Sequence, residues 1–288
     1  MKMPAIDLGK LPPPDAIEAL DVDTLFAERI AELRAALIEE NGSDEPWNAV
    51  LRADPLVKDQ TVNSYRELLL RNRINEAVRA VLLATAMEGD LEQLSADFNL
   101  NRLEGESDDA FRARRQLAPE GYAVAGPEDA YRFHALSVDA TIKQVSAVKG
   151  EDNRVTVVLL SREGNGSVNA GIVAKVHEAL SPLSLRPMTD ALYTRSADIT
   201  ETAVSIRIEI GPGPDAASVE AKALAGLQAY VASRHAVGVT LNYDGLIGAA
   251  RKADPVERVT VLAPEADVDP GVMGAVFVTD IAVEVVRV

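Results

Sequence analysis

Cysteine is absent from the 288 residues of the chain, which excludes disulfides, thiolate metal sites and cysteine nucleophiles together. This absence fits assembly in a reducing cytoplasm. The three histidines, His134, His177 and His235, lie more than 40 residues apart, so none forms the i,i+4 pair of a helical metal site. Aromatic residues are only 4% of the chain, with one tryptophan, which is poor material for a sugar-stacking cleft. We therefore expect no metal and no cofactor.

Positive charge and long apolar runs are also scarce. The chain has 29 Lys and Arg against 45 Asp and Glu, a formal net charge of −16 that repels phosphate backbones and argues against nucleic-acid binding. The longest apolar runs, such as residues 81–84, are far shorter than the roughly 20 residues that cross a bilayer. Residues 1–4 lead into Asp7 and a proline run and not into an apolar segment, so we expect no signal peptide and no membrane partner.

The chain is nonetheless long enough to bury a core, with 47% hydrophobic residues. Residues 1–20 are predicted to form an extended arm, because Pro12–Pro14 favours polyproline II. This arm is either a loose tail or a strap that lies on a neighbour through Ile6, Leu8 and Leu11. Asp21 or Asp23 then caps a predicted helix that ends at residues 41–42.

A second helix is predicted over residues 63–88. Its apolar stripe contains Leu70, Ile74, Ala77, Val78, Val81 and Leu82, and Gly89 is expected to end it. The remaining surface of this helix carries Arg66, Arg71, Arg73 and Arg79. A solvated face is the usual meaning of such charges, but in an acidic protein these arginines also suit an acidic partner helix. The helices therefore fit a bundle that another chain completes, and the candidate interface includes Ile74 and Val78.

A third short helix follows residue 90, and Ser107 is the expected N-cap of a fourth helix that ends by Pro119. The second arginine cluster, Arg112, Arg114 and Arg115, lies on this fourth helix, where either a solvated face or a partner contact is possible. The helical, partner-binding region is therefore placed at residues 21–120.

After residue 121 the hydrophobic period changes from helical to two, which predicts an α+β fold. Residues 155–160 and 204–210 are predicted strands, 49 residues apart, and each leads into a glycine-rich loop and a helix. We interpret them as two α+β modules of strand–loop–helix type in series, at residues 121–192 and 193–288. The last strand, predicted over residues 277–288, has the pattern of an edge that awaits a neighbour.

The motifs of several enzyme classes fail on spacing. Gly164, Gly166 and Gly171 do not match the dinucleotide-binding spacing, and no lysine followed by Ser or Thr accompanies either glycine-rich loop. No GxSxG nucleophile motif occurs. The residues therefore indicate no catalytic site. The alternative to an assembly protein is a soluble hydrolase-like enzyme with a carboxylate pair between the two α+β modules.

Several segments taken together resemble the baseplate J-like proteins. Gly105–Arg115 is similar to the GESD-x-x-FR-x-R stretch of that family. Leu11–Asp15 and Tyr65–Asn75 resemble its opening. Further segments match in order: Ala118–Tyr122, Ala125–Glu128, Tyr131, His134–Ser137, Leu159–Gly166 and Arg186–Asp190.

The resemblance implies a structural wedge subunit in the baseplate of a contractile tail, in a phage or a related particle such as an R-type bacteriocin or a contractile injection system. The particle would assemble in the host cytoplasm. In the family, N-terminal helices join a second wedge protein, and α+β domains contact neighbouring copies in a ring around the central hub and spike. That ring rearranges to trigger sheath contraction. The expected partners are other wedge proteins, copies of the chain itself, and hub or sheath-initiator proteins. The resemblance supplies no catalytic residue.

Overall fold

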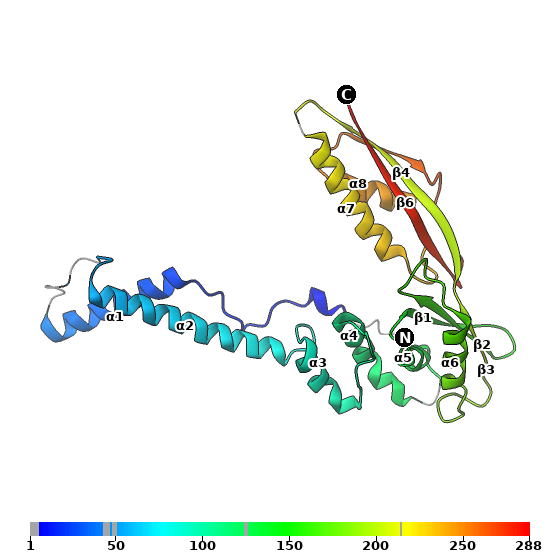
Figure 1. Cartoon of the computed structure of the whole chain (residues 1–288), viewed down its shortest axis with the longest axis horizontal. Coiled ribbons are helices and arrows are strands. Elements are labelled where there is room, and N and C mark those ends of the chain that lie inside the picture. Colours follow the sequence, from blue (N-terminus) through cyan, green and yellow to red (C-terminus); the bar gives the residue numbers. More distant parts are fainter. Residues whose placement is uncertain (1–5, 43–46, 48–50, 124–125, 214) are drawn as a thin grey trace. The chain divides into compact units, whose positions relative to one another are not determined.

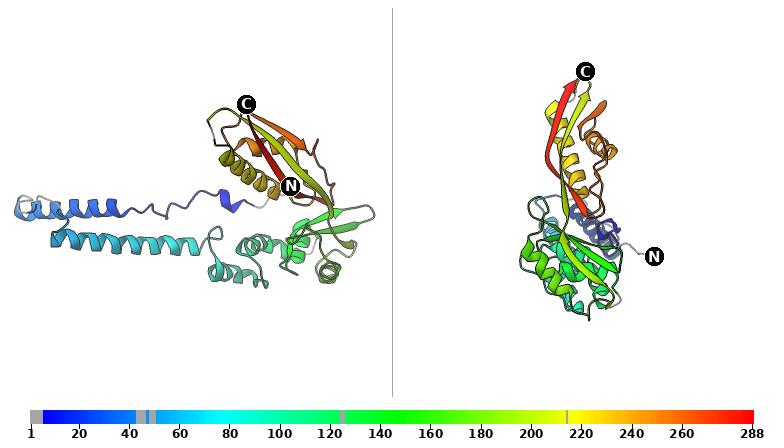
Figure 2. Two further views of the ribbon diagram at one scale, coloured as in Figure 1. Left: turned by 45° about the horizontal axis from the view of Figure 1, so that its top comes forward. Right: turned by 90° about the vertical axis from the view of Figure 1, so that its right-hand side faces the viewer.

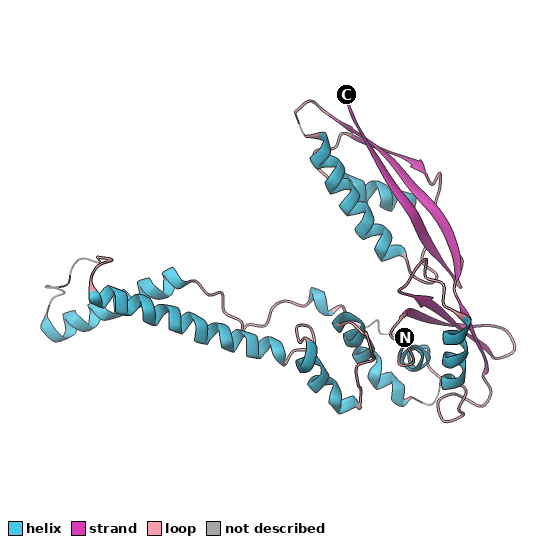
Figure 3. Cartoon of the chain, viewed as in Figure 1, coloured by secondary structure: helices cyan, strands magenta, loops and turns pink. Residues whose placement is uncertain are grey.

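The computed structural model describes residues 6–42, 47, 51–123, 126–213 and 215–288, and it divides into two compact units, residues 1–101 and 102–288. In the described part of the first unit all regular structure is helical, whereas the second unit combines helices with two sheets (Figures 1 and 3). The predicted order of a helical region followed by α+β modules is therefore confirmed. By contacts, the helices of residues 108–122 belong to the second unit.

A helical hairpin dominates the first unit. Helix α1 (Val22–Asn41) begins at its Asp21 cap and ends at Gly42, whose φ of 76° is the left-handed conformation that glycine tolerates. Helix α2 (Pro55–Ala80) packs against it around a small core of Phe26, Ile30, Leu33, Leu37, Trp47 and Val57. A short 3₁₀ turn, η1 (Leu8–Lys10), precedes the hairpin, and α3 (Glu88–Ser95) with η2 (Ala96–Phe98) follows it.

The predicted bounds of the second helix, residues 63–88, are wrong at both ends. Asp54 caps the backbone of Leu56, and Pro55 occupies the first helical turn, where its missing N–H costs nothing. The helix ends at Ala80, and beyond it the Thr85 hydroxyl donates a hydrogen bond to the Arg79 carbonyl at 2.7 Å. Gly89 lies in the first turn of α3 and does not end α2.

Helix α2 holds the arm before α1 at Glu18. The Asn75 side-chain amide accepts a hydrogen bond from the Glu18 backbone N–H at 3.1 Å and donates one to the Glu18 carbonyl at 2.9 Å. Arg71 adds an ion pair to the Glu18 carboxylate at 3.1 Å. Asn75 is 4% exposed, and the reciprocal amide pair explains why a polar residue lies under the arm.

The second unit begins with α4 (Asp108–Leu117), η3 (Ala118–Tyr122) and α5 (Glu128–Leu136). Its first sheet has the order β1-β2-β3, from β1 (Ile142–Lys149), β2 (Arg154–Ser161) and β3 (Ala191–Ser196), with α6 (Ala170–Leu180) between β2 and β3. Strand β2 pairs antiparallel with β1 and parallel with β3. Helices α5 and α6 supply Tyr131, Ala135, Val176 and Leu180 to the core on one face of this sheet.

The second sheet has the order β5-β4-β6, formed by β4 (Asp198–Ile210), β5 (Arg258–Ala263) and β6 (Gly274–Arg287). Strand β4 pairs antiparallel with β5 and parallel with β6. Helices α7 (Ala216–Arg234) and α8 (Tyr243–Arg251) cover one face, and β6 forms an edge of the sheet (Figure 2). Both sheets thus repeat a central strand, a glycine-rich loop and a helix, as predicted. They differ in the flanking strands, since β1 precedes its central strand and β5 follows its own.

One continuous segment joins the two sheets. Only Ala197 separates β3 from β4, so the polypeptide leaves one sheet and enters the next without a loop. The junction encloses a small apolar cluster of Val158, Leu160, Ala197, Val237 and Ala275. Two side chains of β1 secure it: the Lys143 ammonium donates to the His235 carbonyl at 2.7 Å, and the Gln144 carbonyl accepts from the Val237 N–H at 2.9 Å.

Burial of His134 on α5 predicts how stability changes with pH. Burial lowers the pKa of the His134 imidazole, a hydrogen bond with the Gly121 backbone acts in the opposite direction, and Nε2 has no partner among the described residues. The unfolded chain binds this proton near pH 6.5. Below about that pH the unfolded state therefore binds more protons than the folded state, and the free energy of unfolding decreases as pH falls.

The free energy of unfolding measured in urea should fall between about pH 7.5 and about pH 5.5. We predict that His134→Gln makes this fall smaller. The matched control is His177→Gln, because His177 is exposed on α6. A pH dependence of the unfolding midpoint that is the same in His134→Gln and the unsubstituted chain would contradict this assignment.

Candidate interaction surfaces

An uncovered apolar seam runs along the second half of α2. Leu70, Ile74, Ala77 and Val81 follow one another at steps of four, three and four residues, the spacing of a helix–helix seam. Leu70 is 68% exposed, Ile74 61% and Val81 65%. The stripe predicted from the sequence is therefore present, but within its own unit it faces solvent and is not part of the hairpin core. Val78 lies beside it and is half-buried.

The four arginines of α2 differ in how they are used. The carboxylate of Glu67 forms ion pairs with Arg29 and Arg71, each at 2.6 Å. Hydrogen bonds from these two side chains hold the pKa of Glu67 below its usual value. Arg71 is therefore engaged within the hairpin. Arg66 and Arg79 are exposed, and Arg73 makes a 3.5 Å ion pair with Glu76 along the exposed helix surface. Arg66 and Arg73 border the seam on one side.

The second arginine cluster, on α4, contains a buried ion pair. The Arg114 guanidinium forms two hydrogen bonds with the Glu106 carboxylate, at 2.9 and 2.7 Å, and each side chain of the pair is only 3% exposed. Arg114 therefore does not lie on a solvated face. Arg112 pairs with Asp109 at 2.7 Å, and Arg115 is half-buried. A partner contact for Arg112 and Arg115 stays a prediction.

This pair is the centre of a compact arrangement around Phe111. Glu106 also accepts a hydrogen bond from the Leu103 N–H at 3.0 Å, and Arg102 reaches both the Glu106 carbonyl and Asp108. The fully buried Phe111 ring lies within cation–π range of Arg102 and Arg114, at 4.9 and 5.1 Å. Ser107 caps α4 as predicted. The Gly105–Arg115 motif therefore builds its own turn and helix start.

A second apolar surface lies between α1 and α2. It is a groove of about 780 Å³ lined by Val22, Asp23 and Phe26 of α1, by Arg52, and by Val57, Lys58, Thr61, Val62, Ser64 and Tyr65 of α2. The groove was not predicted from the sequence, although Val62, Tyr65 and Leu69 have the three- and four-residue spacing that could have indicated a second stripe. Val62 is 52% exposed and Tyr65 57%. We refer to this surface as the hairpin groove.

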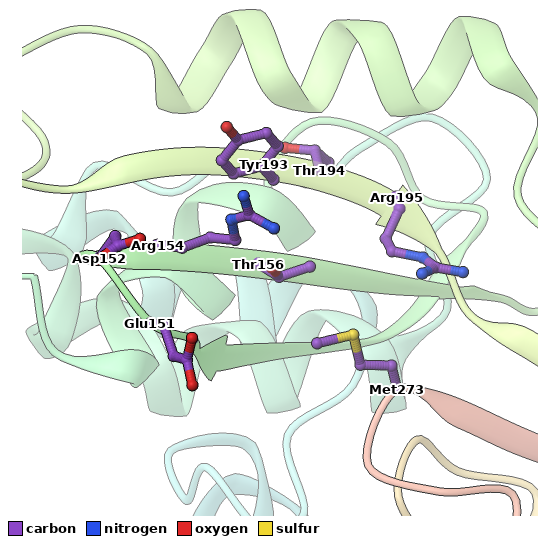
Figure 4. Close-up of a pocket in the computed structure, with 9 residues that line it drawn as sticks. Glu151, Asp152, Arg154, Thr156, Tyr193, Thr194, Arg195 and Met273 are labelled. Carbon is purple, nitrogen blue, oxygen red and sulfur yellow. The ribbon is translucent and has the colours of Figure 1, made fainter.

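Figure 4 shows a shallow hollow on the first sheet of the second unit, with a volume of about 540 Å³. Arg154 stacks on Tyr193 at 4.6 Å, and Arg195 is engaged by Asp198. Glu151 and Asp152 lie at the end nearest the β1–β2 turn, and Met273 at the other (Figure 4). The hollow is open and its charged groups are spread along it, which is the character of a contact surface more than of a reaction site.

No observation favours the hydrolase alternative. Within the described residues, every carboxyl with a resolved pKa shift has a lowered pKa: Asp7, Asp21, Glu67 and Asp139. Tyr131 has a raised pKa, because it is buried and donates a 2.6 Å hydrogen bond to Asp190. The described part of the chain holds no group of three metal-ligating side chains. In the same residues no helix is both long and apolar enough to cross a bilayer.

Comparison with known proteins identifies the class of the chain. Residues 53–109 match the family model of the baseplate J-like N-terminal domain, a region that includes α2 and the turn before α4. The chain is also 36% identical over 293 residues to "Baseplate protein J" of Escherichia phage P2, an alignment that covers 96% of this chain and 97% of that protein. The chain therefore belongs to the baseplate J-like family of phage baseplate proteins.

Removal of one partner of the buried Glu106–Arg114 pair tests its structural role. We predict that Arg114→Met lowers the free energy of unfolding by about 3–5 kcal/mol, because the Glu106 charge is left buried and unpaired. Glu106→Gln combined with Arg114→Met should cost less than Arg114→Met alone. Denaturant unfolding monitored by circular dichroism provides the measurement.

The control is Arg207→Met, which breaks an exposed pair with Glu284 at 2.8 Å and should cost less than about 1 kcal/mol. Equal losses in Arg114→Met and Arg207→Met would contradict the role of the buried pair.

Proposed function

We propose that the chain is a structural wedge subunit in the baseplate of a contractile tail. It joins a second wedge protein through its helical hairpin and contacts neighbouring copies in a ring around the central hub and spike, where hub and sheath-initiator proteins are further neighbours. Rearrangement of the ring triggers sheath contraction. The particle is a phage or a phage-tail-like particle such as an R-type bacteriocin, assembled in the host cytoplasm. Family membership supports the baseplate role.

The observation that carries the partner assignment is the open seam of α2. Burial of a leucine or isoleucine side chain is worth about 1.5–3 kcal/mol, so a helix that covers Leu70, Ile74 and Val81 gains several times the thermal energy at each position. Arg66 and Arg73 at the border of the seam favour a partner helix with acidic residues at its flanking positions. Such a helix completes the bundle that α1 and α2 begin.

We predict that Arg66→Glu with Arg73→Glu weakens the complex with the wedge partner at least about tenfold, and that Ile74→Asp has a similar effect. All three side chains are exposed, so the hairpin should keep its helicity, which circular dichroism checks. Affinity is measured by isothermal titration of the purified wedge partner into each purified variant.

The matched control for charge is Lys175→Glu with Arg258→Glu, two exposed cations of the second unit. Unchanged affinity after reversal of Arg66 and Arg73 would remove them from the interface. A loss of equal size in the control would show a general effect of charge.

The function itself is tested by affinity purification of the tagged chain from cells that produce tails, with mass spectrometry and negative-stain electron microscopy of the same fraction. Recovery with other tail proteins on wedge- or plate-shaped particles is the expected result. A discrete species without tail components, in cells where tails assemble, would overturn the proposal.

A further inference from the structure

The hairpin groove and the α2 seam are separate surfaces. A helix turns by about 100° per residue, which places Val62 about 90° and Tyr65 about 150° around α2 from the centre of the seam. A partner helix on the seam therefore leaves the groove open. Its lining is mostly apolar, with Phe26 and Tyr65 as its aromatic residues. Two cations, Arg52 and Lys58, outnumber the one anion of the lining, Asp23.

The arm has the chemistry that fits such a groove. Leu11 has φ −67° and ψ 140°, which are polyproline II values, and it directly precedes Pro12–Pro14. Leu11 is 49% exposed, and Pro12 and Pro13 are exposed as well. Proline-rich segments in this conformation bind aromatic-lined grooves at low cost in conformational entropy, because their backbone is already ordered. Asp15 follows the prolines and is exposed.

The contact of Asn75 with Glu18 directs the arm away from the groove of its own chain. Asn75 holds Glu18 ten residues beyond Tyr65, about 15 Å along α2. From that point the arm continues beside the second half of α2, away from the groove (Figures 1 and 2). The Leu11–Asp15 segment therefore does not occupy the groove of its own chain.

We propose that the Leu11–Asp15 segment of a neighbouring copy of this chain docks in the hairpin groove. Its prolines pack on Phe26 and Tyr65, and its Asp15 lies beside Arg52 and Lys58, which gives the contact complementary charge. The contact is heterologous, since each copy offers an arm to one neighbour and a groove to another, and such contacts generate rings when the rotation closes. The inference rests on the proposed function, which makes copies of the chain neighbours.

Disulfide cross-linking tests this contact directly, because the chain contains no cysteine of its own. Leu11→Cys combined with Val62→Cys is examined in the purified chain and in assembled tail particles under mild oxidation. Docking between copies raises the local thiol concentration and should give a ladder of covalent dimers and higher oligomers on non-reducing gels, at least about tenfold above the control. Addition of Tyr65→Ser should reduce the ladder.

The control is Leu11→Cys with Ala35→Cys, since Ala35 is exposed on α1 and does not line the groove. A ladder no stronger than this control would overturn the proposal. A fast-migrating monomer would also overturn it, because such a species means that the arm fills its own groove. A disulfide from the Val62→Cys thiol to a different tail protein would overturn it as well. A missing ladder in particles that contain the chain leaves the wedge function intact. A ladder from a chain that joins no tail particle would overturn the wedge function alone.

Discussion

Two helices alone enclose only a small hydrophobic core, and the proposed assembly of this protein depends on that constraint. Helices α1 and α2 bury a few side chains around Trp47 and leave a seam and a groove on α2 exposed to solvent. An exposed pair of apolar surfaces on one helix is costly in an isolated soluble protein and is typical of a chain that completes its core with other molecules. The polar contacts of the hairpin, through Glu67 and Asn75, orient its elements but do not cover these surfaces.

The second unit pairs its buried charges and packs its apolar side chains within the chain itself to a much greater degree. The Glu106–Arg114 pair with Phe111 fixes the start of α4, and the passage from β3 into β4 through Ala197 ties the two sheets to a common apolar junction. A buried ion pair is a weak source of stability but is demanding in geometry. This explains physically why the residues of the Gly105–Arg115 motif occur together: the glycine adopts a positive φ of 75°, the serine caps the helix, and the glutamate and arginine neutralise each other.

Much of the fold could be predicted from local sequence patterns. The period of apolar residues located both long helices, the paired strand–loop–helix units and the last strand, because these patterns reflect burial within the chain. The apolar pattern failed where other features determine where an element begins or whether it is recognised. Asp54 and Pro55 start α2 earlier than its apolar stripe. Strand β3 was missed because its side chains alternate between exposed and half-buried.

The candidate surfaces were less accessible to sequence analysis. A stripe of apolar residues has the same pattern whether it faces its own chain or a partner, so the exposure of Leu70 and Ile74 required the structure. Similarly, nothing in the spacing of Arg112, Arg114 and Arg115 reveals that Arg114 is buried against a glutamate eight residues earlier. The arginines of α2 were recognised as a set, and only the geometry separated Arg66 and Arg73 from Arg71.

The most direct test of the wedge assignment is electron cryomicroscopy of intact tails from a producing strain, with the chain located by its own density. We expect several copies in a ring at the baseplate, with the seam of α2 covered by a helix of another protein. Tails whose baseplate contains no density for this chain, or copies in which the α2 seam faces solvent in the assembled particle, would contradict it.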